Sequence, residues 1–104
     1  MENHKYEIRY TSSFINQFNN ILKYFVNKLN NKIAAENFYK KVVREIEKRS
    51  ESPESYEKYS EIKKRKNAYY RIYVNNYTIF YIVKDNAMEL RKIIYSKRDF
   101  NNLI

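Results

Sequence analysis

The sequence predicts a single α+β domain over residues 1–104, in which a helical hairpin packs on one face of a mostly antiparallel four-stranded sheet. The predicted element order is β-α-α-β-β-β. Three observations indicate it: an alternating segment at the start, two successive amphipathic segments, and three further alternating segments separated by pairs of Asn or Asp residues. A chain of 104 residues suits one hydrophobic core rather than two.

The first predicted element is a short strand over Lys5–Tyr10, because aromatic or apolar residues alternate there with charged ones. Its inward side chains are expected to be Tyr6, Ile8 and Tyr10. A helix follows from about Ser13 to Leu29, since the preceding hydroxyl residues are good N-caps. Its apolar stripe recurs at spacings of three and four residues. The stripe comprises Phe14, Phe18, Leu22, Phe25 and Leu29, widened by Ile15, Ile21 and Val26.

The pair Asn30-Asn31 interrupts this pattern and predicts a tight connection between two antiparallel helices. Asparagine tolerates the left-handed conformation at a helix end and also serves as an N-cap. The second helix is expected from about Lys32 to Arg49. Its predicted apolar stripe is Ile33, Ala34, Phe38, Val42 and Ile46.

A polar segment over Ser50–Asn67 contains the only proline, Pro53, and is interpreted as a loop with a short helical turn. It carries four consecutive cations, Lys63, Lys64, Arg65 and Lys66. Such a run either binds nucleic acid or is a solvated loop.

The last third predicts a β-meander of three strands, Tyr69–Val74, Tyr77–Val83 and Met88–Tyr95. Two-residue hairpin turns need a positive φ, which glycine usually supplies. Because the chain has no glycine, Asn75-Asn76 and Asp85-Asn86 are expected to form both turns.

The first of these turns fixes which side chains share a face. If Val74 pairs with Tyr77, one face is almost wholly apolar and should receive the helices. That face carries Tyr70, Ile72, Val74, Tyr77, Ile79, Tyr81 and Val83. The opposite face, expected to be uncovered, carries Tyr69, Arg71, Tyr73, Thr78 and Phe80.

A cation between aromatic rings on an open sheet face suits single-stranded nucleic acid, because phosphates meet the guanidinium while bases stack on the rings. Two alternatives stay open. The face is solvated, with Arg71 in cation–π contact with its neighbours, or a partner protein covers it.

Composition excludes several classes of function. The absence of cysteine excludes disulfides and thiol nucleophiles, and a single histidine, His4, argues against a His-based metal site or a catalytic triad. The absence of glycine argues against phosphate-binding loops. No apolar run approaches a membrane span. We therefore expect a cytoplasmic protein with no cofactor and no metal.

The chain has 21 Lys+Arg against 12 Asp+Glu, a formal net charge of +9. Such a charge attracts nucleic acid, since counterion release from phosphates drives binding. The alternative is that the lysine content reflects base composition and that the partner is an acidic protein.

With these features the chain resembles the RelE/ParE superfamily, the toxins of bacterial type II toxin–antitoxin modules. The resemblance is carried by the element order, by the meander from Tyr70 to Val83, and by the ending Ile93-Ile94-Tyr95-Ser96-Lys97-Arg98-Asp99-Phe100. It implies a growth-inhibiting toxin neutralised by a cognate antitoxin, which would place an acidic or amphipathic segment on the basic surface and helices.

The superfamily contains two activities, and the first expectation is a RelE-like, ribosome-dependent mRNA endoribonuclease that works without a metal. In such enzymes the 2′-hydroxyl attacks the adjacent phosphate while side chains move protons and stabilise charge. The resemblance assigns Arg71 and Arg98 to the phosphate, with the nucleic-acid-binding candidate Lys97 beside Arg98, and leaves Tyr73 or Tyr95 to donate a proton or stack on a base.

Three positions depart from that pattern. Tyr73 stands where a second lysine often occurs, and Thr78 stands where the third-strand arginine is expected. No tyrosine follows Arg98 at the usual distance.

The Lys-Arg-Asp ending and the missing third-strand arginine favour the alternative, a ParE-like inhibitor of DNA gyrase that needs no such constellation. The basic run Lys63–Lys66 and the net charge of +9 favour RNA and the ribosome. A third reading is a degenerate toxin fold that only binds its partner or nucleic acid. The sequence leaves the target open, either the ribosome with its mRNA or DNA gyrase.

Overall fold

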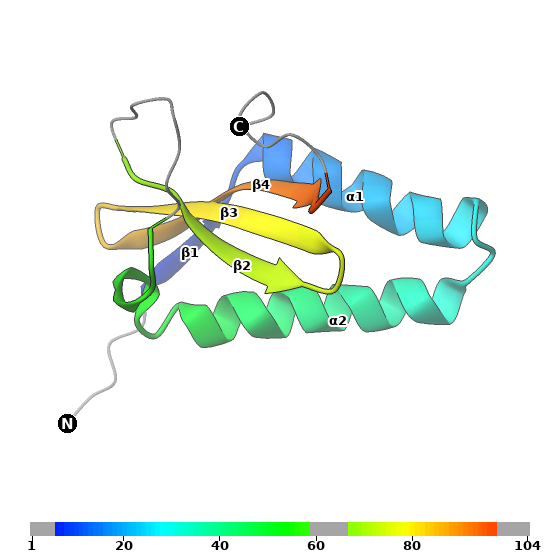
Figure 1. The fold of residues 1–104 in the computed structure, drawn as a ribbon, viewed down its shortest axis with the longest axis horizontal. Coiled ribbons are helices and arrows are strands. Elements are labelled where there is room, and N and C mark those ends of the chain that lie inside the picture. Colours follow the sequence, from blue (N-terminus) through cyan, green and yellow to red (C-terminus); the bar gives the residue numbers. More distant parts are fainter. Residues whose placement is uncertain (1–5, 59–66, 98–104) are drawn as a thin grey trace.

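Two layers, a helical hairpin and a four-stranded sheet, make up the molecule (Figure 1). The computed structural model describes residues 6–58 and 67–97. The predicted α+β class and element order are confirmed. The elements are β1 (Glu7–Tyr10), α1 (Ser12–Asn27), α2 (Lys32–Arg49), a 3-10 turn (Pro53–Ser55), β2 (Tyr70–Val74), β3 (Tyr77–Lys84) and β4 (Ala87–Tyr95).

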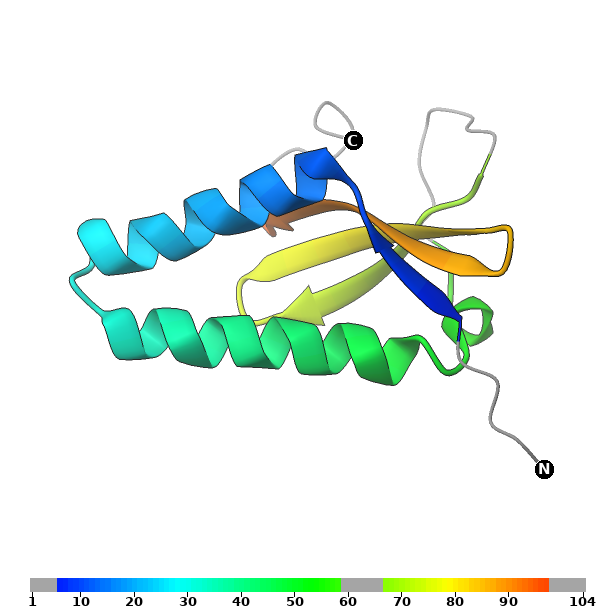
Figure 2. The ribbon, with the colours of Figure 1, turned by 180° about the vertical axis from the view of Figure 1, so that it is seen from behind.

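The strand order in the sheet is β1-β4-β3-β2, with β1 parallel to β4 and the remaining pairs antiparallel. Figure 2 shows β1 leading from the N-terminal end of the chain to the start of α1. The predicted hairpin register is confirmed, because Val74 pairs with Tyr77 and Arg71 pairs with Phe80. The sheet is therefore mostly antiparallel, as the sequence predicted.

The connections between the meander strands contain the residues predicted for them. Asn75 has φ 54°, and Asp85 and Asn86 have φ 52° and 60°. These are left-handed conformations, which asparagine and aspartate tolerate better than most other residues. Asparagine and aspartate therefore take the place of the missing glycines.

Thr11 determines where α1 begins. Its side-chain oxygen accepts a hydrogen bond from the Phe14 amide at 3.2 Å, and its hydroxyl donates to the Leu90 carbonyl at 2.9 Å. One side chain thus caps the helix and ties it to β4. The helix starts at Ser12 and ends at Asn27, so the predicted end at Leu29 was two residues too late.

The connection between the helices works as the sequence suggested. Asn30 adopts a left-handed conformation with φ 48°, and the Asn31 side chain accepts a hydrogen bond from the Ala34 amide at 3.0 Å. Asn30 therefore turns the chain after α1, and Asn31 is the N-cap of α2. The bounds of α2, Lys32–Arg49, match the prediction.

At the tip of the hairpin the predicted apolar stripes were wrong. Val26 and Leu29 are 40% and 51% exposed, and Ile33 is 72% exposed. Figure 1 shows the reason, because the hairpin extends past the end of the sheet. Side chains at the tip therefore face no strand. In α2 the buried alanine is Ala35 rather than Ala34.

The main core lies between the hairpin and the face of the sheet that it covers, called the helix face below. It includes the buried side chains Phe14, Phe18, Phe38, Val42, Ile46, Tyr70, Ile72, Val74, Ile79, Tyr81, Met88, Leu90 and Ile93. The first strand contributes less than predicted. Tyr6 and Ile8 only pack against this core, and Tyr10 is 42% exposed because it lies at a sheet edge.

Candidate interaction surface on the sheet

Arg71 and Tyr73 project from the edge strand β2 onto the face opposite the helices, called the outer face below. The two residues are two positions apart, so their side chains point to the same side. The Arg71 guanidinium lies 5.3 Å from the centre of the Tyr73 ring, and Tyr73 is 60% exposed. A cation and an accessible aromatic ring are thereby held together on this surface.

The rest of the outer face is not open, and here the sequence-based prediction was wrong. Tyr69 and Phe80 are buried, with their ring centroids 5.8 Å apart. With Ile82 and Ile94 they form a second apolar cluster. Burial of apolar area stabilises such a cluster by about 25 cal/mol per Å². Alternation of residue types identifies two faces, but it cannot distinguish an exposed face from a covered one when both are apolar.

Thr78 occupies the position at which the resemblance predicted a third-strand arginine. It is fully buried, and its hydroxyl lies 2.8 Å from the hydroxyl of Ser96. The Ser96 amide donates to the Asn76 carbonyl at 2.8 Å. These polar groups satisfy one another within the protein. The position therefore supplies neither a cation nor a reactive group to the surface.

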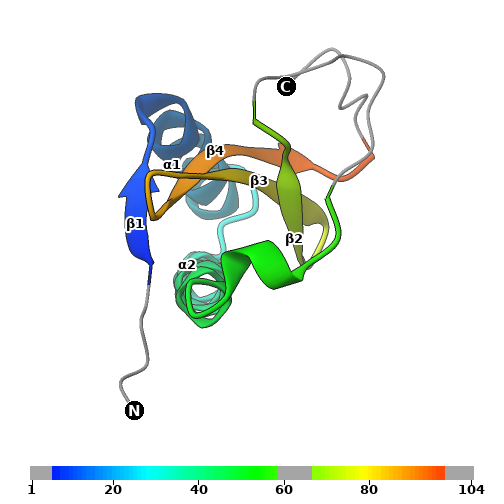
Figure 3. The same cartoon turned by 90° about the vertical axis from the view of Figure 1, so that its left-hand side faces the viewer.

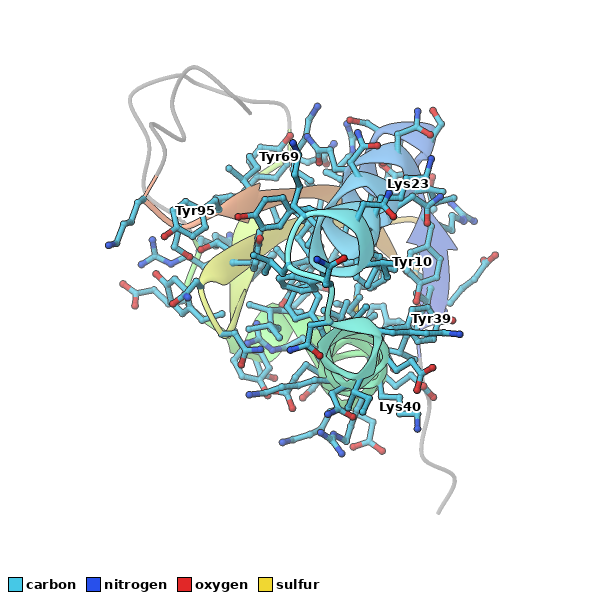
Figure 4. All side chains as sticks on the ribbon, turned by 90° about the vertical axis from the view of Figure 1, so that its right-hand side faces the viewer. Tyr10, Lys23, Tyr39, Lys40, Tyr69 and Tyr95 are labelled. Atoms are coloured by element: carbon cyan, nitrogen blue, oxygen red, sulfur yellow. The ribbon has the colours of Figure 1, made fainter. Side chains whose placement is uncertain are left out.

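Tyr95, a candidate proton donor, lies on the helix face. It pairs with Tyr77 across β3 and β4, and their rings meet edge to face at 5.7 Å. Directly paired residues point to the same side, and Tyr77 belongs to the helix side of the sheet. Figure 4, which looks at the hairpin tip, shows Tyr95 on the opposite side of the molecule from Tyr10 and Tyr39. The structure does not bring Tyr95 together with Arg71 and Tyr73.

Tyr95 lines a pocket of about 580 Å³ between α1 and the end of the sheet. The pocket is also lined by Gln17, Asn20, Ile21, Tyr24, Tyr77, Ile93 and Ile94. Burial raises the pKa of the Tyr77 phenol, and the nearby Tyr24 and Tyr95 raise it further. Tyr77 is therefore neutral at physiological pH and cannot serve there as a base.

The remaining predicted site residues follow β4 or precede β2. Lys97 is exposed directly after Ser96. Arg98 and the run Lys63, Lys64, Arg65 and Lys66 lie outside the described residues. Their predicted roles stay predictions.

One neighbour of this surface was missed by the sequence analysis. Arg49, the last residue of α2, donates a hydrogen bond to the Arg71 carbonyl at 3.0 Å. Basic residues are common in the last turn of a helix, where they favour the helix dipole. No local pattern therefore distinguished Arg49 from Lys48 beside it.

Among residues 6–58 and 67–97 no group of three or more His, Cys, Asp or Glu side chains could hold a metal ion. In the same part of the chain no helix is long and apolar enough to cross a membrane.

A helical hairpin on a mixed four-stranded sheet, in a small and strongly basic chain, is the fold expected of a RelE/ParE superfamily toxin. The family model described as the ParE toxin of type II toxin–antitoxin system, parDE, matches residues 8–100. The chain therefore belongs to the ParE toxin family, which confirms the resemblance found in the sequence. It is the toxin of a type II toxin–antitoxin module, and its partner is a cognate antitoxin. No curated protein matches the chain.

Proposed function

We propose that this toxin arrests growth by binding and inhibiting DNA gyrase, without cleaving RNA. The observation that supports this most is the burial of Thr78, which stands where a nuclease of this superfamily is expected to carry a third-strand arginine. That position therefore gives the outer face no second cation to stabilise charge on a phosphate. Of the two candidate proton donors, Tyr95 lies on the helix face against Tyr77, and only Tyr73 lies beside Arg71.

The outer face has instead the character of a protein-binding surface. Tyrosine and arginine are the residue types that most often dominate binding energy in interfaces. Here the Arg71 guanidinium and the Tyr73 ring are held 5.3 Å apart on a regular strand. A pair that is ordered before binding loses less conformational entropy when it meets its target. We assign Arg71 and Tyr73 to the contact with gyrase and expect Lys97 to contribute charge.

Supercoiling by purified gyrase in the presence of the purified full-length toxin tests this proposal. Wild-type toxin should block supercoiling, and Arg71→Ala and Tyr73→Ala should each inhibit at least about tenfold more weakly. Tyr24→Ala is the matched control, because Tyr24 is 48% exposed but lies on α1. It should inhibit like the wild type. Normal supercoiling by gyrase saturated with wild-type toxin would overturn the proposal.

A second candidate, a ribosome-dependent mRNA endoribonuclease, is favoured by the Arg71–Tyr73 pair itself. A guanidinium beside an exposed ring also suits a phosphate and an unstacked base. In this reading Arg71 and Arg98 bind phosphate, Tyr73 or Tyr95 stacks or donates a proton, and Lys63–Lys66 with Lys97 bind the nucleic acid. Primer extension on cellular mRNA after induction separates the two candidates. Cleavage at codons in the ribosomal A site supports the nuclease, whereas intact mRNA during growth arrest excludes it.

A further inference from the structure

Arg49 is an arginine at the junction of four elements. It is the last residue of α2. Its guanidinium contacts the Tyr56 ring directly after the 3-10 turn, the Arg71 carbonyl of β2 and the Tyr81 hydroxyl of β3. Figure 3 shows this end of the molecule, with α2 seen end-on and the segment that follows it running across to β2. Among the described residues no carboxylate lies within ion-pair distance of Arg49. Its contacts are with a carbonyl, a hydroxyl and aromatic rings.

These contacts form a connected set. The same Arg49 nitrogen, Nη1, donates to the Arg71 carbonyl at 3.0 Å and to the Tyr81 hydroxyl at 3.1 Å. The Tyr81 hydroxyl in turn donates to the Pro53 carbonyl at 2.8 Å. The Arg49 guanidinium lies 3.6 Å from the centre of the Tyr56 ring. Planar stacking and hydrogen bonding together are specific to arginine, since a lysine ammonium cannot reproduce both.

The acceptor on β2 matters because β2 is an edge strand. At an edge, every second residue turns its backbone carbonyl away from the neighbouring strand and needs another donor. For Arg71 that donor is Arg49. The Arg71 side chain points to the outer face, while the hairpin lies on the helix face. Arg49 therefore binds the backbone of Arg71 from the side of the sheet opposite to the Arg71 side chain.

We propose that Arg49 is a positioning residue, which holds the β2 backbone at Arg71 so that the Arg71 and Tyr73 side chains keep their spacing on the outer face. The role of that spacing in gyrase inhibition rests on the function proposed above. Arg49 itself makes no contact with the target.

The test compares Arg49→Lys with Arg44→Lys, the same substitution at an exposed position of the same helix. Both variants are purified as the full chain and checked for folding by circular dichroism. Arg49→Lys should shift the amide resonances of Arg71 and Tyr73 and reduce inhibition of gyrase at least about tenfold. Arg44→Lys should change neither. A purely structural role would lower the melting temperature but leave the resonances and the inhibition by folded protein unchanged.

If Arg49→Lys does not fold, Arg49→Met replaces it, because it removes the donor to the Arg71 carbonyl and retains a long side chain without a charge. The proposal is overturned if the folded variant shows wild-type resonances at Arg71 and Tyr73, or inhibits gyrase as wild type does. If wild-type toxin fails to inhibit gyrase, the proposed function fails alone. The resonances then decide the positioning role, because they do not depend on the target.

Discussion

The two faces of the sheet use their aromatic and aliphatic residues differently. On the helix face these side chains join one continuous core with the hairpin. On the outer face the described residues Tyr69, Phe80, Ile82 and Ile94 form a smaller buried cluster, and Tyr73 on the same face is 60% exposed. Within β2 itself, Tyr70 on the helix face is 5% exposed, whereas Tyr73 on the outer face is 60% exposed. That difference marks the candidate interaction surface.

The sharpest test of this difference uses two tyrosines of β2. Tyr70 is buried and stacks on Tyr81 with ring centroids 5.2 Å apart, whereas Tyr73 is exposed. Tyr70→Ala should lower the free energy of unfolding by about 3–5 kcal/mol. Tyr73→Ala should lower it by less than about 1 kcal/mol, since it removes only an exposed cation–π contact. Urea denaturation measures both, and equal losses would show that the two faces do not differ.

Two isoleucines of β3 compare the cores themselves. Ile79 is buried in the main core, and Ile82 is buried in the outer cluster. We expect Ile79→Ala to cost about 4 kcal/mol and Ile82→Ala about 2 kcal/mol. The smaller cluster has fewer neighbours around the cavity and can collapse into it more completely. A larger loss for Ile82→Ala in urea denaturation would contradict this ranking of the two cores.

The turn between β3 and β4 fixes the register of these two strands. A slip of one residue would move every side chain of a strand to the other face of the sheet. Asp85 has φ 52° in this turn. Asp85→Ala should lower the free energy of unfolding by about 1 kcal/mol, since alanine tolerates the left-handed conformation poorly. Asp85→Gly should be as stable as the wild type. If the midpoints of urea denaturation rank the two variants the other way, the turn does not depend on backbone conformation.

The smallest expected effect is a loss of stability at alkaline pH that arises on the helix face. Burial raises the pKa of the Tyr81 phenol above its ordinary value of 10.0, although the hydrogen bond and charge of Arg49 oppose the shift. The folded state therefore holds the phenol proton more tightly than the unfolded state does. The contribution of this proton to the free energy of unfolding is fully present below about pH 10 and is lost as the pH rises through the raised pKa of Tyr81.

Urea midpoints between about pH 8 and about pH 11 measure this loss, and Tyr81→Phe should make the decline shallower. An equally steep decline in Tyr81→Phe would assign the effect to other groups.

Local patterns in the chain predicted the elements well, because helix caps and turns depend on near neighbours. Thr11, Asn31, Asn75 and Asp85 could each be assigned from residue type and position, and the structure places each in the predicted kind of turn or cap. The hairpin register followed from the length of the Asn75-Asn76 turn. The exposure of Val26, Leu29 and Ile33 at the hairpin tip could not be predicted in this way, because amphipathic spacing does not reveal where the opposing sheet ends.

By itself, the sequence determined the order of the elements, the pairing of β2 with β3 and the presence of Arg71 and Tyr73 on one face. Each of these depends on short-range spacing and backbone conformation. Only the tertiary structure decided that Phe80 and Thr78 are buried, that Tyr95 lies on the other face and that Arg49 meets the carbonyl of Arg71. These three outcomes depend on how the helices and strands lie against one another. Such packing brings together residues that are distant in the chain, and no local pattern records it.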